Sequence, residues 1–104
     1  MASPGSKSLV RLLAAVEGFY SRYGHWPTRV RLFPGLIEDI KSNILTNKQY
    51  QSLTARIELV PDSEAPVIAE DNEGNNYDYG KEGFPKEKPK VRAGKWLGLQ
   101  HIEP

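Results

Sequence analysis

The sequence SLVRLLAAVEGFYSRYG, residues 8–24, has helical periodicity and determines how the rest of the chain can be organised. Its apolar residues fall at positions 9, 12, 13, 16, 19, 20 and 23, the spacing that places side chains on one face of an α-helix. Ser6 or Ser8 can cap the first turn, and Gly24 stands where a left-handed residue commonly ends a helix. We therefore predict a long amphipathic helix whose apolar stripe packs into the core.

The segment that follows this helix changes from helical to alternating periodicity. Between Pro27 and Pro34, Val30 and Leu32 alternate with two arginines. An alternation of apolar and charged residues is typical of a strand with one buried face and one solvent-exposed face. The segment therefore predicts a strand of about five residues.

Two short helices are predicted next. Residues 36–44 return to helical spacing and carry two acidic residues in the first turn, where the helix dipole favours negative charge. Thr46 and Gln49 fit a capping box, in which each side chain satisfies a backbone N–H near the helix start. This pattern predicts a third helix over about 47–56.

The second half of the chain alternates with a period of two. Residues 57–61, 66–70 and 75–79 each predict a strand, and Asp71-Asn-Glu-Gly74 predicts a hairpin turn in which a glycine can adopt positive φ. We expect the three strands to form an antiparallel meander. Because the helices and strands are partly segregated along the chain, the predicted fold class is α+β.

The predicted organisation is a single domain with two less ordered ends. Residues 1–5 are expected to form a disordered start, residues 6–80 the α+β domain, and residues 81–104 a basic and largely flexible tail. The tail ends in an apolar cluster that can dock either on the domain or on a partner. Its members are Trp96, Leu97, Leu99 and Ile102.

Composition is that of an ordinary globular domain. The 104 residues are 38% hydrophobic and 26% charged, and they include no cysteine. The lack of cysteine excludes disulfides, thiolate nucleophiles and Cys-ligated metal sites, and it suits a reducing compartment. The apolar run from Leu9 to Val16 is interrupted by Arg11, unlike the core of a signal peptide, and no stretch reaches the roughly 20 apolar residues of a membrane span. We expect a cytoplasmic protein without membrane contact.

Charge is distributed unevenly although the net charge is only +1. Residues 1–61 carry a net charge of +4, residues 62–80 carry −6 and residues 81–104 carry +3. An acidic segment between two basic ones can neutralise them internally or can keep two functional surfaces apart. The total charge therefore indicates no class of partner.

Catalytic, metal-binding and nucleotide-binding patterns are missing from the sequence. The sequence pattern assigns no carboxylate or hydroxyl to His25 or His101 as a partner, and two isolated histidines do not give the ligand spacing of a zinc site. The chain has no Gly-rich phosphate loop and no G-x-S-x-G nucleophile elbow. The sequence therefore predicts no enzyme activity, no cofactor and no metal site.

The residue types that remain as functional candidates are basic and aromatic residues, which commonly bind other macromolecules, and they are concentrated in two stretches. Between residues 20 and 31, arginines alternate with aromatic residues, as on surfaces that bind nucleic acids. From residue 86 onward, basic residues lead up to a tryptophan. The candidate binding surface comprises Arg22, His25, Trp26, Arg29, Arg31, Lys86, Lys88, Lys90, Arg92, Lys95 and Trp96.

Two functional hypotheses follow from these features. The first is a small, non-enzymatic binding module that contacts another protein. The alternative is a nucleic-acid-associated factor, in which the arginines and tail lysines contact phosphates and Trp26 or Trp96 stacks on bases. The acidic segment 62–80 disfavours the alternative, whereas Arg29 and Arg31 favour it.

Overall fold

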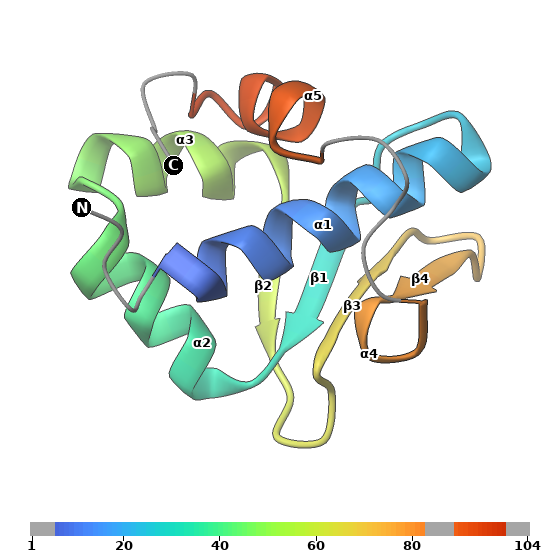
Figure 1. Ribbon diagram of the computed structural model, residues 1–104, viewed down its shortest axis with the longest axis horizontal. Helices are drawn as coiled ribbons and strands as arrows, with labels where there is room; N and C mark the ends of the chain where they lie inside the picture. Colours follow the sequence, from blue (N-terminus) through green and yellow to red (C-terminus); the bar gives the residue numbers. More distant parts are fainter. Residues whose placement is uncertain (1–5, 83–88, 100–104) are drawn as a thin grey trace.

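The computed structural model describes residues 6–82 and 89–99, which form a mixed α+β fold with one four-stranded sheet (Figure 1). The elements are α1 (Ser6–Tyr23), β1 (Arg29–Leu32), α2 (Pro34–Asp39), the π-helical turn η1 (Ile40–Ile44), α3 (Asn47–Arg56), β2 (Glu58–Pro61), β3 (Val67–Glu70), β4 (Asn76–Asp78), α4 (Tyr79–Glu82) and α5 (Pro89–Trp96). The α+β class predicted from the sequence is confirmed.

The sheet has the strand order β2-β1-β3-β4, so the predicted three-stranded meander is wrong. β1 lies between β2 and β3, pairing with β2 in parallel and with β3 antiparallel. Only β3 and β4 form the expected hairpin. Parallel strands need a long crossover connection, and residues 33–57 with their helices supply it. The first strand therefore lies inside the sheet, between two of the strands that the sequence had grouped in one meander.

Helix α1 lies at the centre of the fold and packs against elements on several sides (Figure 1). It contacts β3 and β4 on one side and α5 on another, and residues 12–19 are all buried. Phe19, Leu12 and Val16 are completely buried and belong to one core cluster with residues from every strand except β2, whose Leu59 packs against it. Within the described residues, no helix is both long and apolar enough to cross a membrane.

Several local signals form the structures that the sequence predicted. Gly24 has a φ of 80° and donates its N–H to the Tyr20 carbonyl at 2.8 Å, which ends α1 in the left-handed conformation. Thr46 and Gln49 form both hydrogen bonds of the capping box at the start of α3. Gly74 has a φ of 90° in the β3–β4 turn. These features depend on residues close in sequence, which is why the sequence reveals them.

The second helix is less regular than its apolar spacing predicted. It begins at Pro34 and changes after Asp39 into the π-helical turn η1, which ends where Leu45 donates its N–H to the Ile40 carbonyl. A π turn rotates the following chain relative to a continuous α-helix. Ile40 and Leu45 both enter the core through this turn.

The core continues beyond β4 into residues that the sequence had assigned to the largely flexible tail 81–104. Ala93, Leu97 and Leu99 are buried in the main cluster, so α5 and the residues after it are part of the packed domain. Gly98, with a φ of 78°, closes α5 in a Schellman motif, in which the Leu99 N–H reaches the Gly94 carbonyl. The structure does not describe residues 1–5, 83–88 and 100–104, the last of which include Ile102. The disorder and flexibility predicted for them therefore stay predictions.

Candidate functional site

Arg29 and Arg31 lie on the face of the sheet that points away from α1. Their neighbours in β1, Val30 and Leu32, are fully buried, so the strand's alternation places the two arginines on the opposite side. Both guanidinium groups bind the Glu70 carboxylate on β3, through Arg29 Nε at 2.6 Å and Arg31 Nε at 3.1 Å. Glu70 therefore bridges the two arginines that the sequence offered as phosphate contacts.

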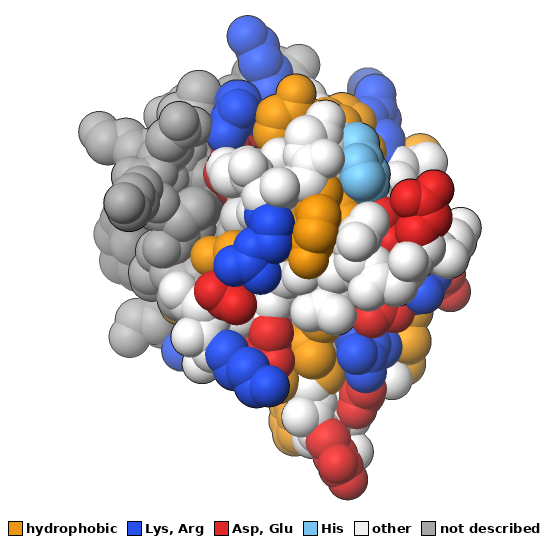
Figure 2. All heavy atoms as spheres, turned by 90° about the vertical axis from the view of Figure 1, so that its right-hand side faces the viewer, with side chains coloured by type: hydrophobic (Ala, Val, Ile, Leu, Met, Phe, Trp, Pro, Cys, Tyr) orange, Lys and Arg blue, Asp and Glu red, His pale blue; other side chains and the backbone are white. Residues whose placement is uncertain are grey.

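Further acceptors occupy the same two guanidinium groups. Arg29 donates to the Asn72 side chain at 2.7 Å, and Arg31 binds the Asp62 carboxylate at 2.9 Å. The acidic segment thus neutralises the arginines of β1, one of the two roles that the charge distribution had allowed. Figure 2 shows the side of the molecule that carries the β3–β4 hairpin, where basic and acidic side chains lie next to one another. A phosphate would have to compete with carboxylates already bound there.

Arg22 is engaged in a similar way near the end of α1. It forms an ion pair with Glu82 at 2.9 Å, and its guanidinium carbon lies 5.1 Å from the centre of the Tyr77 ring. This ion pair lowers the pKa of the Glu82 carboxyl. Arg22 therefore connects α1 to α4 and β4 rather than extending the surface of Arg29 and Arg31.

His25 forms a pair with Asp71, a contact between residues far apart in the sequence. The His25 Nε2 and Asp71 Oδ2 atoms are 2.8 Å apart, and the Asp71 side chain is only 6% exposed. Asp71 also closes the hairpin turn, because its Oδ1 accepts the backbone N–H groups of Glu73 and Asn75. One carboxylate thus joins the loop after α1 to the β3–β4 turn.

The two members of this pair shift each other's protonation. The hydrogen bond to Asp71 raises the pKa of His25, and the same bond is the main cause that lowers the pKa of Asp71. A histidine held by a carboxylate resembles the base and orienting group of a catalytic triad, but a triad also needs a nucleophile. In the part of the chain that the structure describes, no hydroxyl is hydrogen-bonded to His25.

Trp26 and Trp96 come together although 70 positions separate them in the sequence. Their rings are stacked, with centroids 4.6 Å apart and planes inclined by 6°. Tyr20 joins the group, its ring centroid lying 4.2 Å from that of Trp26. The three aromatic residues come from α1, from the loop before β1 and from the end of α5, so they hold α5 against the domain.

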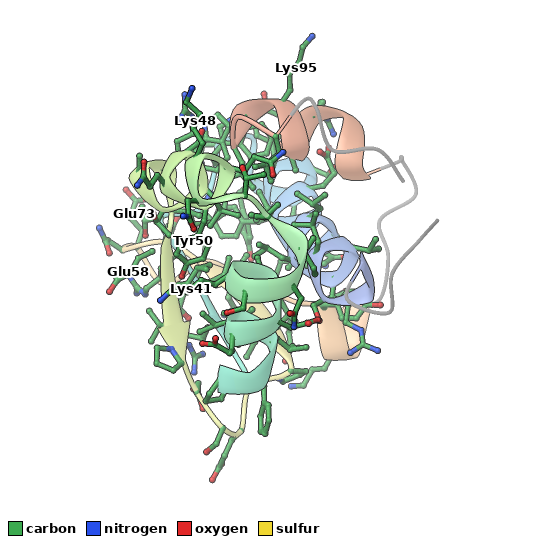
Figure 3. All side chains as sticks on the ribbon, turned by 90° about the vertical axis from the view of Figure 1, so that its left-hand side faces the viewer. Lys41, Lys48, Tyr50, Glu58, Glu73 and Lys95 are labelled. Carbon is green, nitrogen blue, oxygen red and sulfur yellow. The ribbon has the colours of Figure 1, made fainter. Side chains whose placement is uncertain are left out.

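Two cationic side chains of α5 complete this group, which we call the aromatic patch: Tyr20, Trp26, Arg92, Lys95 and Trp96. The Arg92 guanidinium carbon lies 4.9 Å from the centre of the Tyr20 ring, and Arg92 also forms an ion pair with the fully buried Glu17 of α1. Lys95 is exposed and projects outward from α5 (Figure 3). The five residues line a shallow depression of about 390 Å³.

A second hollow, which we call the apolar groove, lies toward the other end of α1 and has a volume of about 610 Å³. Its lining residues come from α1, the start of α2, the β2–β3 connection, β3 and α4, and most of them are apolar. They are Arg11, Phe33, Leu36, Ser63, Glu64, Ala65, Pro66, Val67, Tyr79 and Gly80. Among the described residues, Phe33 is the large apolar side chain that stands exposed, at 50%.

Phe33 occupies an unusual position for an exposed aromatic residue. It is the N-cap of α2, with Pro34 following it, and its side chain makes no capping hydrogen bond. Ser, Thr, Asp or Asn at this position typically stabilises a helix by about 1 kcal/mol relative to a residue without a cap. The chain thus gives up a local stabilisation and places an aromatic ring in solvent, and such departures from local preference concentrate at functional sites.

The structure divides the candidate residues that the sequence singled out. Trp26, Arg92, Lys95 and Trp96 share the aromatic patch, whereas Arg22, His25, Arg29 and Arg31 bind acidic side chains elsewhere. Lys86, Lys88 and the side chain of Lys90 lie outside the described residues. Sequence reasoning missed Phe33 and the apolar groove, and the only available signal was an aromatic residue in a capping position.

Comparison with known proteins adds no assignment. No family model, curated protein or solved structure significantly matches the chain. Within the described residues, no three His, Asp or Glu side chains gather in a group that could hold a metal ion.

Proposed function

We propose that this protein is a small, non-enzymatic binding module that contacts another protein through the apolar groove. The observation that carries the proposal is Phe33, half exposed at the edge of a hollow lined mainly by apolar residues. Exposed apolar surface that is concave and rimmed by polar groups is typical of protein-binding sites. Arg11 and Glu64 supply that polar rim.

The elements around the groove favour a partner that inserts a large apolar side chain. Ala65 and Val67 line it as buried apolar residues, and Pro66 and Tyr79 add further apolar surface to its lining. Hydrophobic anchors that fill such pockets supply most of the binding free energy in many protein interfaces. An extended or helical segment with one aromatic or branched aliphatic anchor fits this description.

The non-enzymatic part of the proposal is supported by how the titratable groups are used. Among the described residues, the large pKa shift belongs to Asp71, which closes the β3–β4 hairpin and pairs with His25. Neither residue lines the apolar groove or the aromatic patch. Perturbed groups at an active site normally face the cavity that holds the substrate.

The test is a peptide selection on wild-type protein without counter-selection, after which the affinity of each enriched peptide is measured for wild type and for the Phe33→Ser variant. We expect enriched peptides to carry a large apolar anchor and to bind Phe33→Ser roughly five- to thirtyfold more weakly, because the anchor loses a contact worth about 1–2 kcal/mol. Lys41→Ala, on an exposed residue of η1 that does not line the groove, serves as the matched control and should bind normally.

Amide chemical shifts locate the bound peptide independently of the variants. We expect the Gly80 and Gly35 signals to move, since Gly80 lines the groove and Gly35 lies against the Phe33 ring, while Gly74 in the hairpin turn stays in place. Peptides that bind Phe33→Ser as tightly as wild type would contradict the proposal. So would shifts centred on Gly74.

A further inference from the structure

The aromatic patch combines two features that recognise different parts of one ligand. Trp26 and Trp96 are each only partly buried, so ring surface remains accessible beside their stacked contact. Arg92 and Lys95 lie in the same depression, and the described residues that line it include no acidic side chain. Aromatic faces bind flat, uncharged ring systems, whereas cationic groups next to them bind anions.

The charge around the patch is positive, unlike that around Arg29 and Arg31. Among the described residues, the acidic group paired with this patch is Glu17, which is completely buried and forms an ion pair with Arg92. The Lys95 side chain points away from the body of the protein (Figure 3), and among the described residues it forms no ion pair. An incoming phosphate would therefore meet Lys95 without displacing a carboxylate.

We infer that the aromatic patch, formed by Tyr20, Trp26, Arg92, Lys95 and Trp96, binds single-stranded nucleic acid. A base stacks on the tryptophan pair, and the phosphates on either side of it contact Lys95 and the exposed edge of Arg92. A duplex does not fit this mode, because its bases are already stacked on one another. The patch is separate from the apolar groove, so this inference does not depend on the proposed protein-binding function.

The stacked tryptophans also hold α5 in place, and a purely structural role has to be distinguished from binding. A structural contact needs only the faces that the two indoles turn toward each other. It does not explain why Lys95, which forms no ion pair among the described residues, lines the same depression. The decisive measurements therefore use Lys95, whose exposed side chain can be removed without disturbing the aromatic contact.

The experiment is a fluorescence titration of the full chain with a single-stranded oligothymidylate of about 12 nucleotides. Both tryptophans of the chain belong to the aromatic patch, so intrinsic tryptophan emission reports on this site alone. We expect quenching that saturates, with an affinity that falls as salt is raised. Lys95→Ala should reduce the slope of log affinity against log salt by about 0.7, as expected for the loss of one phosphate contact with a single strand.

Matched variants and competitors make the outcome decisive. Lys41→Ala removes an exposed lysine far from Lys95 (Figure 3) and should leave both affinity and slope unchanged. Trp96→Leu should weaken binding by about tenfold, the loss of one base-stacking contact, with the fold checked by circular dichroism. The inference is refuted if no quenching occurs at low salt, if Lys41→Ala acts like Lys95→Ala, or if a duplex or polyglutamate competes equally well.

Discussion

Gly18 lies in the middle of α1 and provides the sharpest test of how the core is packed. The Tyr77 ring covers this glycine so closely that a Cβ atom added there would overlap it, with even ring atom Cε2 only 2.7 Å away. Tyr77 cannot easily withdraw, because it is itself 6% exposed within the core cluster. Gly18→Ala therefore has to move either the ring or the helix.

The magnitude follows from two opposing effects. Replacing glycine by alanine inside a helix normally stabilises it by up to about 1 kcal/mol. Overpacking a closely packed core costs about 1–3 kcal/mol, and the contact with several ring atoms places Gly18 at the upper end of this range. We expect a net loss of about 2 kcal/mol in the free energy of unfolding, which corresponds to a melting temperature lower by roughly 10 °C.

Gly94 is the matched control, because it lies in α5 and an added Cβ would meet nothing within 4 Å. Gly94→Ala should raise stability by about 0.5–1 kcal/mol through helix propensity alone. Urea unfolding followed by circular dichroism measures both variants. Combining Gly18→Ala with Tyr77→Leu should remove most of the penalty of the alanine. A Gly18→Ala protein as stable as wild type, or an unchanged penalty in the Tyr77→Leu background, would refute this account.

Two further outcomes follow from the geometry. Gly24 and Gly98 both have left-handed backbone, but an added Cβ would collide with the Ser52 side chain only at Gly98. Gly24→Ala should therefore lower the free energy of unfolding by about 1 kcal/mol, and Gly98→Ala should lower it distinctly more. Thermal unfolding measures both variants. For His25, the raised pKa means that its pairing with Asp71 stabilises the fold fully below the ordinary value of 6.5 and that this contribution is lost as pH rises through the raised value. Urea unfolding between about pH 6 and pH 9 should therefore show wild type losing stability relative to His25→Gln, and parallel curves for the two proteins would contradict the assignment.

Local sequence signals predicted much of the secondary structure. The apolar spacing of α1, the alternation of β1 and the capping box before α3 each depend on residues within a few positions of one another. Their physical causes, which are side-chain periodicity and the hydrogen bonds of helix ends, act locally and can be read from a single sequence. The same holds for the β3–β4 hairpin with Gly74.

Local signals of this kind could not predict which strands pair with one another. An alternating run predicts a strand but not its neighbour, and 57–61 has the same pattern whether it pairs with β1 or with β3. The parallel choice depends on how the helices of 34–56 pack over the sheet. The candidate surface was divided for a similar reason, because the carboxylates of Glu70 and Asp62 reach Arg29 and Arg31 only through this strand order.

The sequence by itself determined an α+β domain, the ends of its clearest helices and the lack of cysteine chemistry. Only the tertiary structure decided which charged and aromatic residues meet: it paired Trp26 with Trp96, placed the buried Glu17 beneath Arg92 and left Phe33 in solvent. The physical reason is that helix periodicity and capping act over a few residues, whereas burial and ion pairing depend on distances set by the whole packed chain.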